Sequence, residues 1–229
     1  MRFELSPSLL LVHGWGFGAG VWHPVRRALA PAKVRTLDLG FYGSPNLTLP
    51  PEDSFVAVGH SLGFLWLTRQ LEYPDFAARC RGLVAINGFC RFSRAPDYPL
   101  GVAGRILERM AARLKEEPVE VLSLFQRQGG LERPLSIPAE SLNPHLLADG
   151  LNWLAEWDTR ALLAAWTRPL LVIASSDDRV VTPEMTRAQF DHLTPNPLHW
   201  LPDGGHLLPL SRPERCASLI HSFFRACAS

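Results

Sequence analysis

Residues 55–63 read Phe55-Val56-Ala57-Val58-Gly59-His60-Ser61-Leu62-Gly63, and an apolar stretch over residues 64–71 follows them. The first four residues form an unbroken apolar run, which is typical of a strand buried on both faces of a parallel sheet. The next five fit the pattern Gly-x-Ser-x-Gly, in which a strained strand-to-helix turn exposes a serine hydroxyl and glycines avoid collisions beside it. Because a buried strand precedes the pattern and an apolar helix follows it, Ser61 is the candidate nucleophile. The alternative is a glycine-flanked surface turn without chemistry.

Further short apolar runs lie on both sides of this turn and predict the rest of a sheet. The expected strands are residues 9–12, 34–39, 83–86, 169–174 and 198–201. Helical spacing occurs between them, as in residues 21–29, and a closing helix is expected over about residues 213–224. Buried strands that alternate with helices indicate βαβ units, so we expect an α/β fold with a mainly parallel sheet flanked by helices.

One segment interrupts this alternation. Between residues 86 and 169 no run has the pattern of a strand, and only helix-like segments such as residues 106–114 and 119–125 occur. We therefore expect one α/β domain over residues 1–229 with a helical cap inserted at about residues 91–149. A chain of 229 residues, of which 47% are hydrophobic, suits one such domain better than two.

A serine at its ordinary pKa is a weak nucleophile and needs a base, which an acid in turn orients. In folds with this turn the chain order is serine, acid, histidine. His206 ends a glycine-containing loop after the last expected strand and is the best candidate base. The loop after residue 174 offers two adjacent acids, Asp177 and Asp178. Asp178 is preferred because x-Val-Val and a proline-started helix follow it, and Asp177 stays open as the alternative. The acid that is not used would cap a turn or a helix.

Acyl transfer also needs hydrogen-bond donors aimed at the oxygen on which negative charge develops. The backbone N–H after the candidate nucleophile belongs to Leu62. A second donor is expected from the turn His13-Gly14-Trp15-Gly16, with the N–H of Trp15 preferred. The alternative for this turn is a tight loop with a packed indole. The two roles are compatible, because the donor is a backbone group.

Charge and composition exclude several other classes of function. Lys and Arg number 23 and Asp and Glu 22, so a formal charge of +1 disfavours binding to nucleic acid or an acidic membrane. No apolar run approaches the roughly 18 to 20 residues that span a bilayer, and the amino terminus lacks the cleavage site of a signal peptide. The four cysteines show neither metal-ligand spacing nor a disulfide pattern. We expect a cytoplasmic protein without a metal or an organic cofactor.

Five motifs, taken in chain order, resemble those of the α/β-hydrolase superfamily: the His13-Gly14 turn, residues 38–44, the turn at Ser61, the Asp178 loop and the His206 loop. Within this superfamily the chain is similar to the pimeloyl-acyl-carrier-protein methyl ester esterases of biotin synthesis. The local matches are residues 10–16, 21–22, 90–93, 122–126, 149–151 and 157–160. The chain departs from this family at His60, where relatives often carry Trp, and at Phe64, where a glycine is usual. Residues 38–55 are also too short for the helix normally found there.

The resemblance implies a serine carboxylesterase that uses Ser61, His206 and Asp178 as its triad. It also implies an acyl site lined by Trp15, Ser61, Leu62, Leu122, Phe125 and Gln126. Because the family's substrate is presented on an acidic carrier protein, a basic docking face is expected. Arg105, Arg109 and Arg113 share one helical face by their four-residue spacing and offer such a face. The alternative is a solvated helix surface, since glutamates are interleaved with these arginines.

The residues leave other functions open. A broad-specificity short-chain carboxylesterase, an acyltransferase or a carbon–carbon bond hydrolase would use the same three side chains. Dehalogenase or epoxide hydrolase chemistry is disfavoured, because those enzymes carry an aspartate in the place of Ser61. A non-catalytic binding module on the same fold is the rival from a different class. Such a module would be expected to lack one of the three residues.

Overall fold

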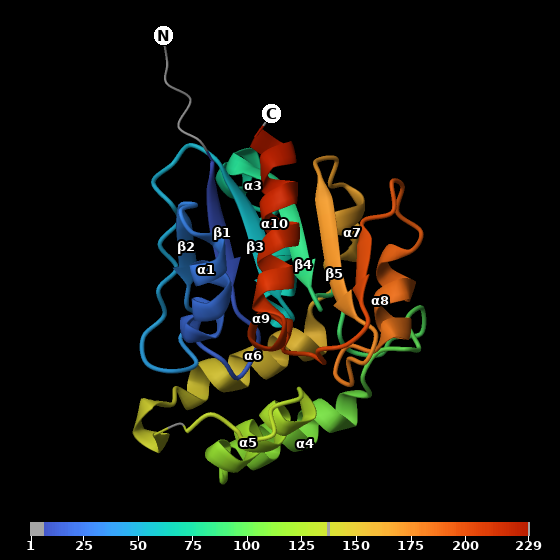
Figure 1. Ribbon diagram of the computed structural model, residues 1–229. Coiled ribbons are helices and arrows are strands. Elements are labelled where there is room, and N and C mark those ends of the chain that lie inside the picture. Colours follow the sequence, from blue (N-terminus) through green and yellow to red (C-terminus); the bar gives the residue numbers. More distant parts are fainter. Residues whose placement is uncertain (1–6, 137, 229) are drawn as a thin grey trace.

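The computed structural model describes residues 7–136 and 138–228, and its centre is a six-stranded parallel sheet (Figure 1). The strands are β1 (Ser8–Val12), β2 (Val34–Leu37), β3 (Phe55–His60), β4 (Cys80–Ile86), β5 (Leu170–Ser175) and β6 (Leu198–Leu201). Their order is β2-β1-β3-β4-β5-β6, and every neighbouring pair is parallel. The expected α/β fold with a mainly parallel sheet is confirmed. Residues 1–6, on which the expectation about a signal peptide partly rests, lie outside the described residues.

Side chains of each strand alternate between the two faces of the sheet, and both faces are buried. In β1, Leu9 and Leu11 pack into one apolar cluster while Leu10 and Val12 pack into the other. All four side chains are fully buried. Successive side chains of a strand point to opposite faces, so a sheet covered on both sides requires an unbroken apolar run. This requirement explains the runs seen in the sequence.

Helices cover both faces of the sheet (Figure 1). One face is covered by η1 (Ala19–Trp22), α1 (His23–Leu29), α9 (Leu208–Ser211) and α10 (Pro213–Ala228). The cluster on the other face includes side chains from α2 (Leu62–Gln70), α3 (Pro74–Arg79), α7 (Arg160–Ala164) and α8 (Pro183–Phe190). Residues 38–54, which connect β2 to β3 and are all described, contain no helix.

The chain leaves the core after β4 and returns before β5 through residues 91–158, which we call the cap. Its helices are α4 (Gly104–Leu114), α5 (Pro118–Gln128), η2 (Ala139–Ser141) and α6 (Pro144–Glu156). In Figure 1 the cap lies below the carboxyl ends of the strands. The sequence placed the end of the cap at about residue 149, but Asp149 lies inside α6, whose buried positions Leu147, Leu151 and Leu154 continue past it. The segment therefore ends later than predicted.

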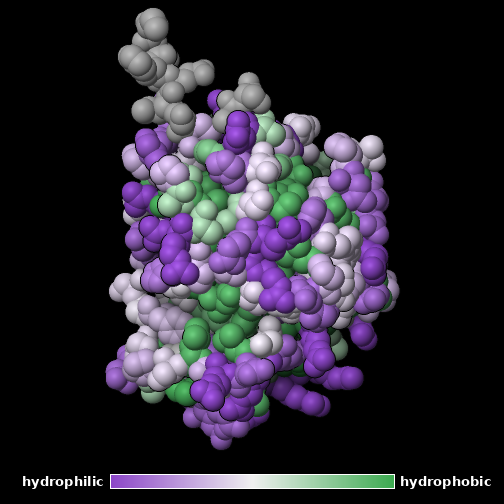
Figure 2. Space-filling view, viewed as in Figure 1, coloured by the Kyte–Doolittle hydropathy of each residue, from purple (hydrophilic) through white to green (hydrophobic). Residues whose placement is uncertain are grey.

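The hydropathy of the surface differs between the outer side of the cap and the junction of the cap with the core. Figure 2 shows hydrophobic side chains gathered where the cap meets the core, and a mainly hydrophilic surface along the bottom of the cap. The exposed large apolar residues of the cap include Ile106, Val119, Leu124 and Leu135. The cap thus has both a polar outer surface and partly uncovered apolar positions.

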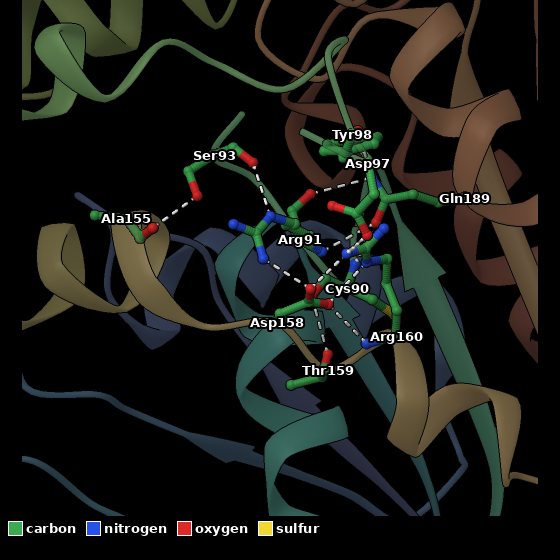
Figure 3. Close-up of polar contacts among 10 residues, drawn as sticks. All are labelled: Cys90, Arg91, Ser93, Asp97, Tyr98, Ala155, Asp158, Thr159, Arg160 and Gln189. Carbon is green, nitrogen blue, oxygen red and sulfur yellow. Dashed lines mark hydrogen bonds and ion pairs between the residues drawn. The ribbon is translucent and has the colours of Figure 1, made fainter. Parts of the chain in front are cut away.

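A polar network fastens the two ends of the cap to each other (Figure 3). Arg91 donates to the Asp158 carboxylate over 2.7 Å, and Arg160 donates to the same carboxylate over 2.9 and 2.6 Å. Beside this contact, the N–H of Thr159 donates to the carbonyl of Cys90 over 2.8 Å. The chain therefore leaves and re-enters the core at a single place.

Gln189 of α8 ties this junction to the core (Figure 3). Its side-chain oxygen accepts from the N–H groups of Cys90 and Arg91 over 2.7 and 3.0 Å. Its side-chain nitrogen donates to the carbonyl of Arg91 over 3.1 Å and to the hydroxyl of Tyr98 over 2.7 Å. Gln189 is buried, so these contacts replace hydration and hold the start of the cap at one point on the core.

Candidate active site

The turn at Ser61 has a strained backbone. Ser61 directly follows β3, and α2 begins at the next residue. Its φ of 54° and ψ of −124° lie where non-glycine residues are uncommon. A Cβ at Gly59 would lie 2.4 Å from the backbone of Phe64, and one at Gly63 would lie 2.2 Å from the carbonyl oxygen of Val12. Only glycine fits at these two positions: Gly59 allows β3 to approach α2, and Gly63 allows α2 to approach the end of β1.

Ser61, His206 and Asp178 form a continuous chain of contacts. Nε2 of His206 lies 3.0 Å from Oγ of Ser61, and Nδ1 of His206 lies 2.8 Å from Oδ2 of Asp178. The other oxygen of Asp178 accepts from the N–H groups of Val180 and Val181 over 2.7 and 3.0 Å, which fixes the carboxylate. A carboxylate only accepts, so the imidazole proton lies on Nδ1 and leaves Nε2 free to accept from the serine hydroxyl. With this arrangement a serine can be deprotonated as it attacks.

Of the two adjacent aspartates, Asp178 contacts His206 and Asp177 does not. Oδ1 of Asp177 accepts from the hydroxyl of Ser175 over 2.5 Å and from the N–H of Gly205 over 2.8 Å. Burial opposes the ionisation of Asp177, but these hydrogen bonds outweigh it and lower the pKa of the carboxyl. Asp177 thus braces the loop that carries His206.

His60, the residue before Ser61, is fully buried beside His206, with ring centroids 4.9 Å apart. Burial, and then the neighbouring His206, lower the pKa of His60 to about 3. His60 is therefore neutral near physiological pH and does not compete for a proton in the site.

The two predicted oxyanion donors belong to turns that meet at Ser61. Leu62 is the first residue of α2, so its N–H has no acceptor within the helix. Trp15 lies in the turn after β1, and a Cβ at Gly14 in this turn would be 3.0 Å from Cβ of Ser61. The indole of Trp15 is 1% exposed and donates to the carbonyl of Leu147 over 2.8 Å. The indole is therefore packed against the cap, and both N–H groups remain the predicted donors.

An apolar cavity of about 210 Å³ lies at Ser61, between the core and the cap. Trp15 and Phe125, two residues predicted to line an acyl site, belong to its wall. The rest of the wall comes mainly from the cap and the Asp178 loop: Phe92, Leu100, Val102, Ile106, Leu107, Met110, Gln128, Leu154, Arg179, Val180, Thr182 and Met185. Cap residues therefore shape the space beside the candidate nucleophile.

Leu122 and Gln126, also predicted to line the acyl site, do not line this cavity. Leu122 is fully buried against the turn at Gly16, where a Cβ would lie 3.0 Å from Cδ2 of Leu122. Gln126 is fully buried too, and its side-chain oxygen accepts from the N–H of Leu135 over 2.8 Å. Both side chains pack α5, so the structure does not bring these two predicted residues to the cavity wall.

Sequence reasoning did not predict the wall that α4 supplies. Ile106, Leu107 and Met110 recur at the spacing of one helix face, and this pattern indicated a helix without showing what its face meets. Arg179, next to Asp178, brings a positive charge to the same wall. Within the described residues, no three His, Cys, Asp or Glu side chains gather closely enough to hold a metal ion.

A second hollow, of about 270 Å³, adjoins the cavity between α4 and α5. The two share four lining residues: Ile106, Met110, Phe125 and Gln128. The second hollow is also lined by Arg109 and Arg113, together with Val121 and Leu124. Two of the three predicted docking arginines therefore lie beside a groove that continues from the space at Ser61.

Similar proteins are known at the level of sequence. The alpha/beta hydrolase family matches residues 9–219. A pimeloyl-acyl-carrier-protein methyl ester esterase of Aromatoleum aromaticum is 30% identical, over 96% of this chain and 98% of that protein. The biotin biosynthesis bifunctional protein BioHC of Cellvibrio japonicus is 27% identical over 97% of this chain. The match covers only 48% of BioHC, so the chain spans about half the length of that relative.

Solved structures share the fold. An esterase from Exiguobacterium antarcticum matches with a TM-score of 0.82 at 14% identity, over 97% of this chain and 93% of the other. A bromoperoxidase from Bacillus anthracis matches with a TM-score of 0.81 at 17% identity, over the same shares of the two chains.

Among the described residues, no helix is long and apolar enough to cross a membrane. The family match over residues 9–219 and the esterase relatives identify this chain as a member of the alpha/beta hydrolase family and a hydrolase of the carboxylesterase type.

Proposed function

We propose that this protein is a serine carboxylesterase that hydrolyses the methyl ester of pimeloyl-acyl-carrier protein in biotin synthesis. The observation that carries the proposal is the contact from Ser61 through His206 to Asp178, beside an apolar cavity. The choice of substrate is supported by the similarity to the pimeloyl-acyl-carrier-protein methyl ester esterase of Aromatoleum aromaticum, which is 30% identical over nearly the whole of both chains.

Hydrolysis would proceed in two stages. Nε2 of His206 takes the hydroxyl proton as Oγ of Ser61 attacks the ester carbonyl, and Asp178 stabilises the imidazolium. The N–H groups of Trp15 and Leu62 hold the developing oxyanion. The intermediate then expels methoxide, to which His206 gives its proton, so methanol departs and an acyl ester is left on Ser61. Water, deprotonated by His206, attacks this ester and releases the carboxylic acid and the free serine.

The cavity suits a chain of methylene groups. Phe92, Leu107, Met110 and Leu154 give it an apolar wall, and each methylene buried against such a wall contributes about 0.8 kcal/mol. The adjoining groove between α4 and α5 offers a continuation for the part of the substrate that leads to a carrier. This arrangement fits an ester at the far end of an acyl chain that is tethered outside the site.

For the carrier we propose docking at the exposed arginines of α4, Arg105, Arg109 and Arg113. Arg113 already forms ion pairs with Glu117 and Glu120 over 2.9 and 3.3 Å. The charge available to an acidic partner therefore comes mainly from Arg105 and Arg109. Attraction of this kind acts over about a Debye length and weakens with salt.

The test is hydrolysis of methyl pimeloyl-carrier protein compared with free short-chain methyl esters. We expect a kcat/KM at least about tenfold larger for the carrier-bound ester, a difference of about 1.4 kcal/mol. Ser61→Ala should lower kcat by several orders of magnitude for both. A preference for unrelated esters would refute the biotin-pathway substrate, and near-native activity of Ser61→Ala would refute the serine mechanism.

The docking face has its own test. Arg105→Glu combined with Arg109→Glu should raise KM for the carrier-bound ester and leave the free methyl esters unchanged. Arg127→Glu combined with Lys115→Glu makes the same change of charge at other exposed cap positions and is the control. An equal rise of KM for the carrier-bound ester in the two double variants would refute docking at α4.

A broad-specificity short-chain carboxylesterase is the second candidate, and the size of the cavity favours it. Pockets for drug-sized ligands hold about 300 to 1,000 Å³. At about 210 Å³, the cavity is smaller than this range. If short esters react as fast as the carrier-bound ester, this candidate replaces the first. Product analysis with added alcohols or thiols separates both from an acyltransferase.

A further inference from the structure

The loop that carries His206 has an unusual backbone. Gly204 and Gly205 precede the histidine with φ values of 120° and 62°, in the region that favours glycine. Two consecutive glycines give a loop much conformational freedom, and yet His206 must stay within hydrogen-bond distance of Ser61. Side chains from outside the loop must therefore fix it.

The main-chain carbonyl of His206 is held by two side chains. Nε2 of His60 lies 2.9 Å from this oxygen, and the side-chain nitrogen of Asn87 also lies 2.9 Å from it. His60 is the last residue of β3, and Asn87 follows β4. Hydrogen bonds from the ends of two neighbouring central strands, β3 and β4, thus hold the loop.

Asn87 joins further parts of the same region. Its side-chain nitrogen also donates to the carbonyl of Gly205 over 2.9 Å, and its side-chain oxygen accepts from the N–H of Ser175 over 2.9 Å. Ser175 in turn donates to Asp177, which accepts from the N–H of Gly205. These hydrogen bonds close a ring that links the loop of the base to the loop of the acid. The φ of Asn87 is 44°, a conformation that asparagine tolerates better than most residues.

The tautomer of His60 follows from its partner. A carbonyl oxygen only accepts, so the proton of the neutral ring lies on Nε2. Nδ1 of His60 has no hydrogen-bond partner among the described residues, and the side chain is fully buried. A positive charge on His60 would oppose the imidazolium that forms on His206 during the reaction. A neutral donor of one hydrogen bond is therefore the useful state of this side chain.

We propose that His60 and Asn87 are positioning residues, which together hold the main-chain carbonyl of His206 and so keep its Nε2 in reach of Ser61. This inference rests on the proposed function, in which His206 is the base. It assigns a role to the residue before the nucleophile and to the residue after β4, neither of which touches the reacting atoms.

The main comparison is between His60→Gln and His60→Leu. Glutamine keeps a neutral N–H donor, whereas leucine is apolar and has none. We expect His60→Leu to lower kcat for a p-nitrophenyl ester by about tenfold or more, with KM within about twofold of the wild-type value. It should slow the reaction of Ser61 with a fluorophosphonate to the same degree. His60→Gln should restore both rates to within about threefold of wild type.

Asn87→Gly is the second variant. Glycine adopts the backbone conformation of Asn87 readily, so this change removes the three hydrogen bonds of the side chain without straining the turn. We expect the same loss of kcat and of labelling rate as for His60→Leu. Thermal unfolding of every variant shows which are folded, and Asn87→Gly carries the test if His60→Leu does not fold.

The inference is overturned if folded His60→Leu or Asn87→Gly keeps the wild-type kcat and labelling rate. It is also overturned if His60→Gln is as slow as His60→Leu, because the donor would then be irrelevant. Failure of the proposed function gives a different result. In that case the wild-type protein would not react with the fluorophosphonate, or Ser61→Ala would retain its activity.

Discussion

The guanidinium of Arg91 donates to the carboxylate of Asp158 over 2.7 Å, and this contact joins the start of the cap to its end. Hydrogen bonds from Arg160 and then Arg91 hold the pKa of Asp158 well below its usual range, although burial opposes them. Much of the cavity wall belongs to the cap. The junction therefore determines where that wall stands relative to Ser61.

Replacing Asp158 by asparagine should loosen the cap and leave the core intact. We expect Asp158→Asn to raise KM about threefold or more for ester substrates, to change kcat by less than about twofold, and to lower Tm by about 2–4 °C. Steady-state kinetics and thermal unfolding measure these effects. Glu52→Gln, which removes a 3.7 Å ion pair with Lys33 outside the cap, is the control. An equal change of KM in the two variants would contradict a role of the junction.

The two adjacent aspartates should differ strongly in their effect on catalysis. Asp178→Asn removes the acceptor of the His206 Nδ1 proton and should lower kcat by about ten-thousand-fold. Asp177→Asn weakens the bracing of Gly205 and should lower kcat by less than about tenfold. Hydrolysis of a p-nitrophenyl ester by the two variants, side by side, provides the measurement. Comparable losses would mean that the acid is assigned wrongly.

Gly63 should be irreplaceable for a steric reason. A Cβ there would meet the carbonyl oxygen of Val12 at 2.2 Å, and neither backbone can move without disturbing the sheet. We expect Gly63→Ala to lower the free energy of unfolding by more than about 3 kcal/mol. Gly20, where a Cβ has nothing within 4 Å, is the matched site, and Gly20→Ala should change stability by less than about 1 kcal/mol. Denaturant unfolding compares the two, and a mild effect at Gly63 would show that the turn can adapt.

His60 should make stability depend on pH. An unfolded histidine takes up a proton near pH 6.5, but His60 in the folded protein does so only near pH 3. Between these values the unfolded state binds about one proton more, so the free energy of unfolding falls as pH falls, by about 1.4 kcal/mol per pH unit. His60→Gln should remove this contribution, while His206 and His13, which face His60, are present in both proteins. Denaturant unfolding between pH 4 and 7 gives the two slopes, and equal slopes would contradict the prediction.

The cavity wall on α4 should select for the length of the acyl chain. Met110→Trp adds bulk beside Ser61, so we expect kcat/KM for p-nitrophenyl octanoate to fall by about tenfold or more while the value for the acetate changes little. Leu122→Met, a nearly isosteric change at a buried position outside the cavity, is the control and should leave both esters unaffected. A uniform loss for both esters in Met110→Trp would mean that the wall does not discriminate length.

Much of the core could be predicted because a few neighbouring residues define each element. The turn at Ser61 depends on Gly59 and Gly63, which the backbone of adjacent elements leaves no room to replace. The meeting of serine, acid and histidine follows from the parallel sheet, since each lies in a loop after a strand and the carboxyl ends of parallel strands meet at one edge. The choice between Asp177 and Asp178 needed the three-dimensional structure, because the two side chains lie in one loop but bind different partners.

The cap was harder to predict from the sequence. The spacing of apolar residues indicated α5, but the rotation of that helix depends on what packs against it. Leu122 meets Gly16 and Gln126 meets Leu135, so of the three predicted residues on α5 only Phe125 reaches the cavity. Tertiary packing, rather than local preference, decides this point. The end of the cap was misplaced although the sequence carries the signals of α6: Asn143-Pro144 starts the helix, and Leu147, Leu151 and Leu154 recur on one of its faces.

The hydrogen bond from Thr159 to Cys90 also bears on how related hydrolases could acquire different caps. Because the N–H of Thr159 donates to the carbonyl of Cys90 over 2.8 Å, the two residues that flank the cap are neighbours. A replacement cap that also packs on Trp15, as α6 does, would leave the strand connections and the three residues proposed for chemistry in place. Recombination at these two points would exchange one substrate-facing module for another of different length. Grafting a cap from a related hydrolase between Cys90 and Thr159 is thus a direct route to new selectivity with the same reaction.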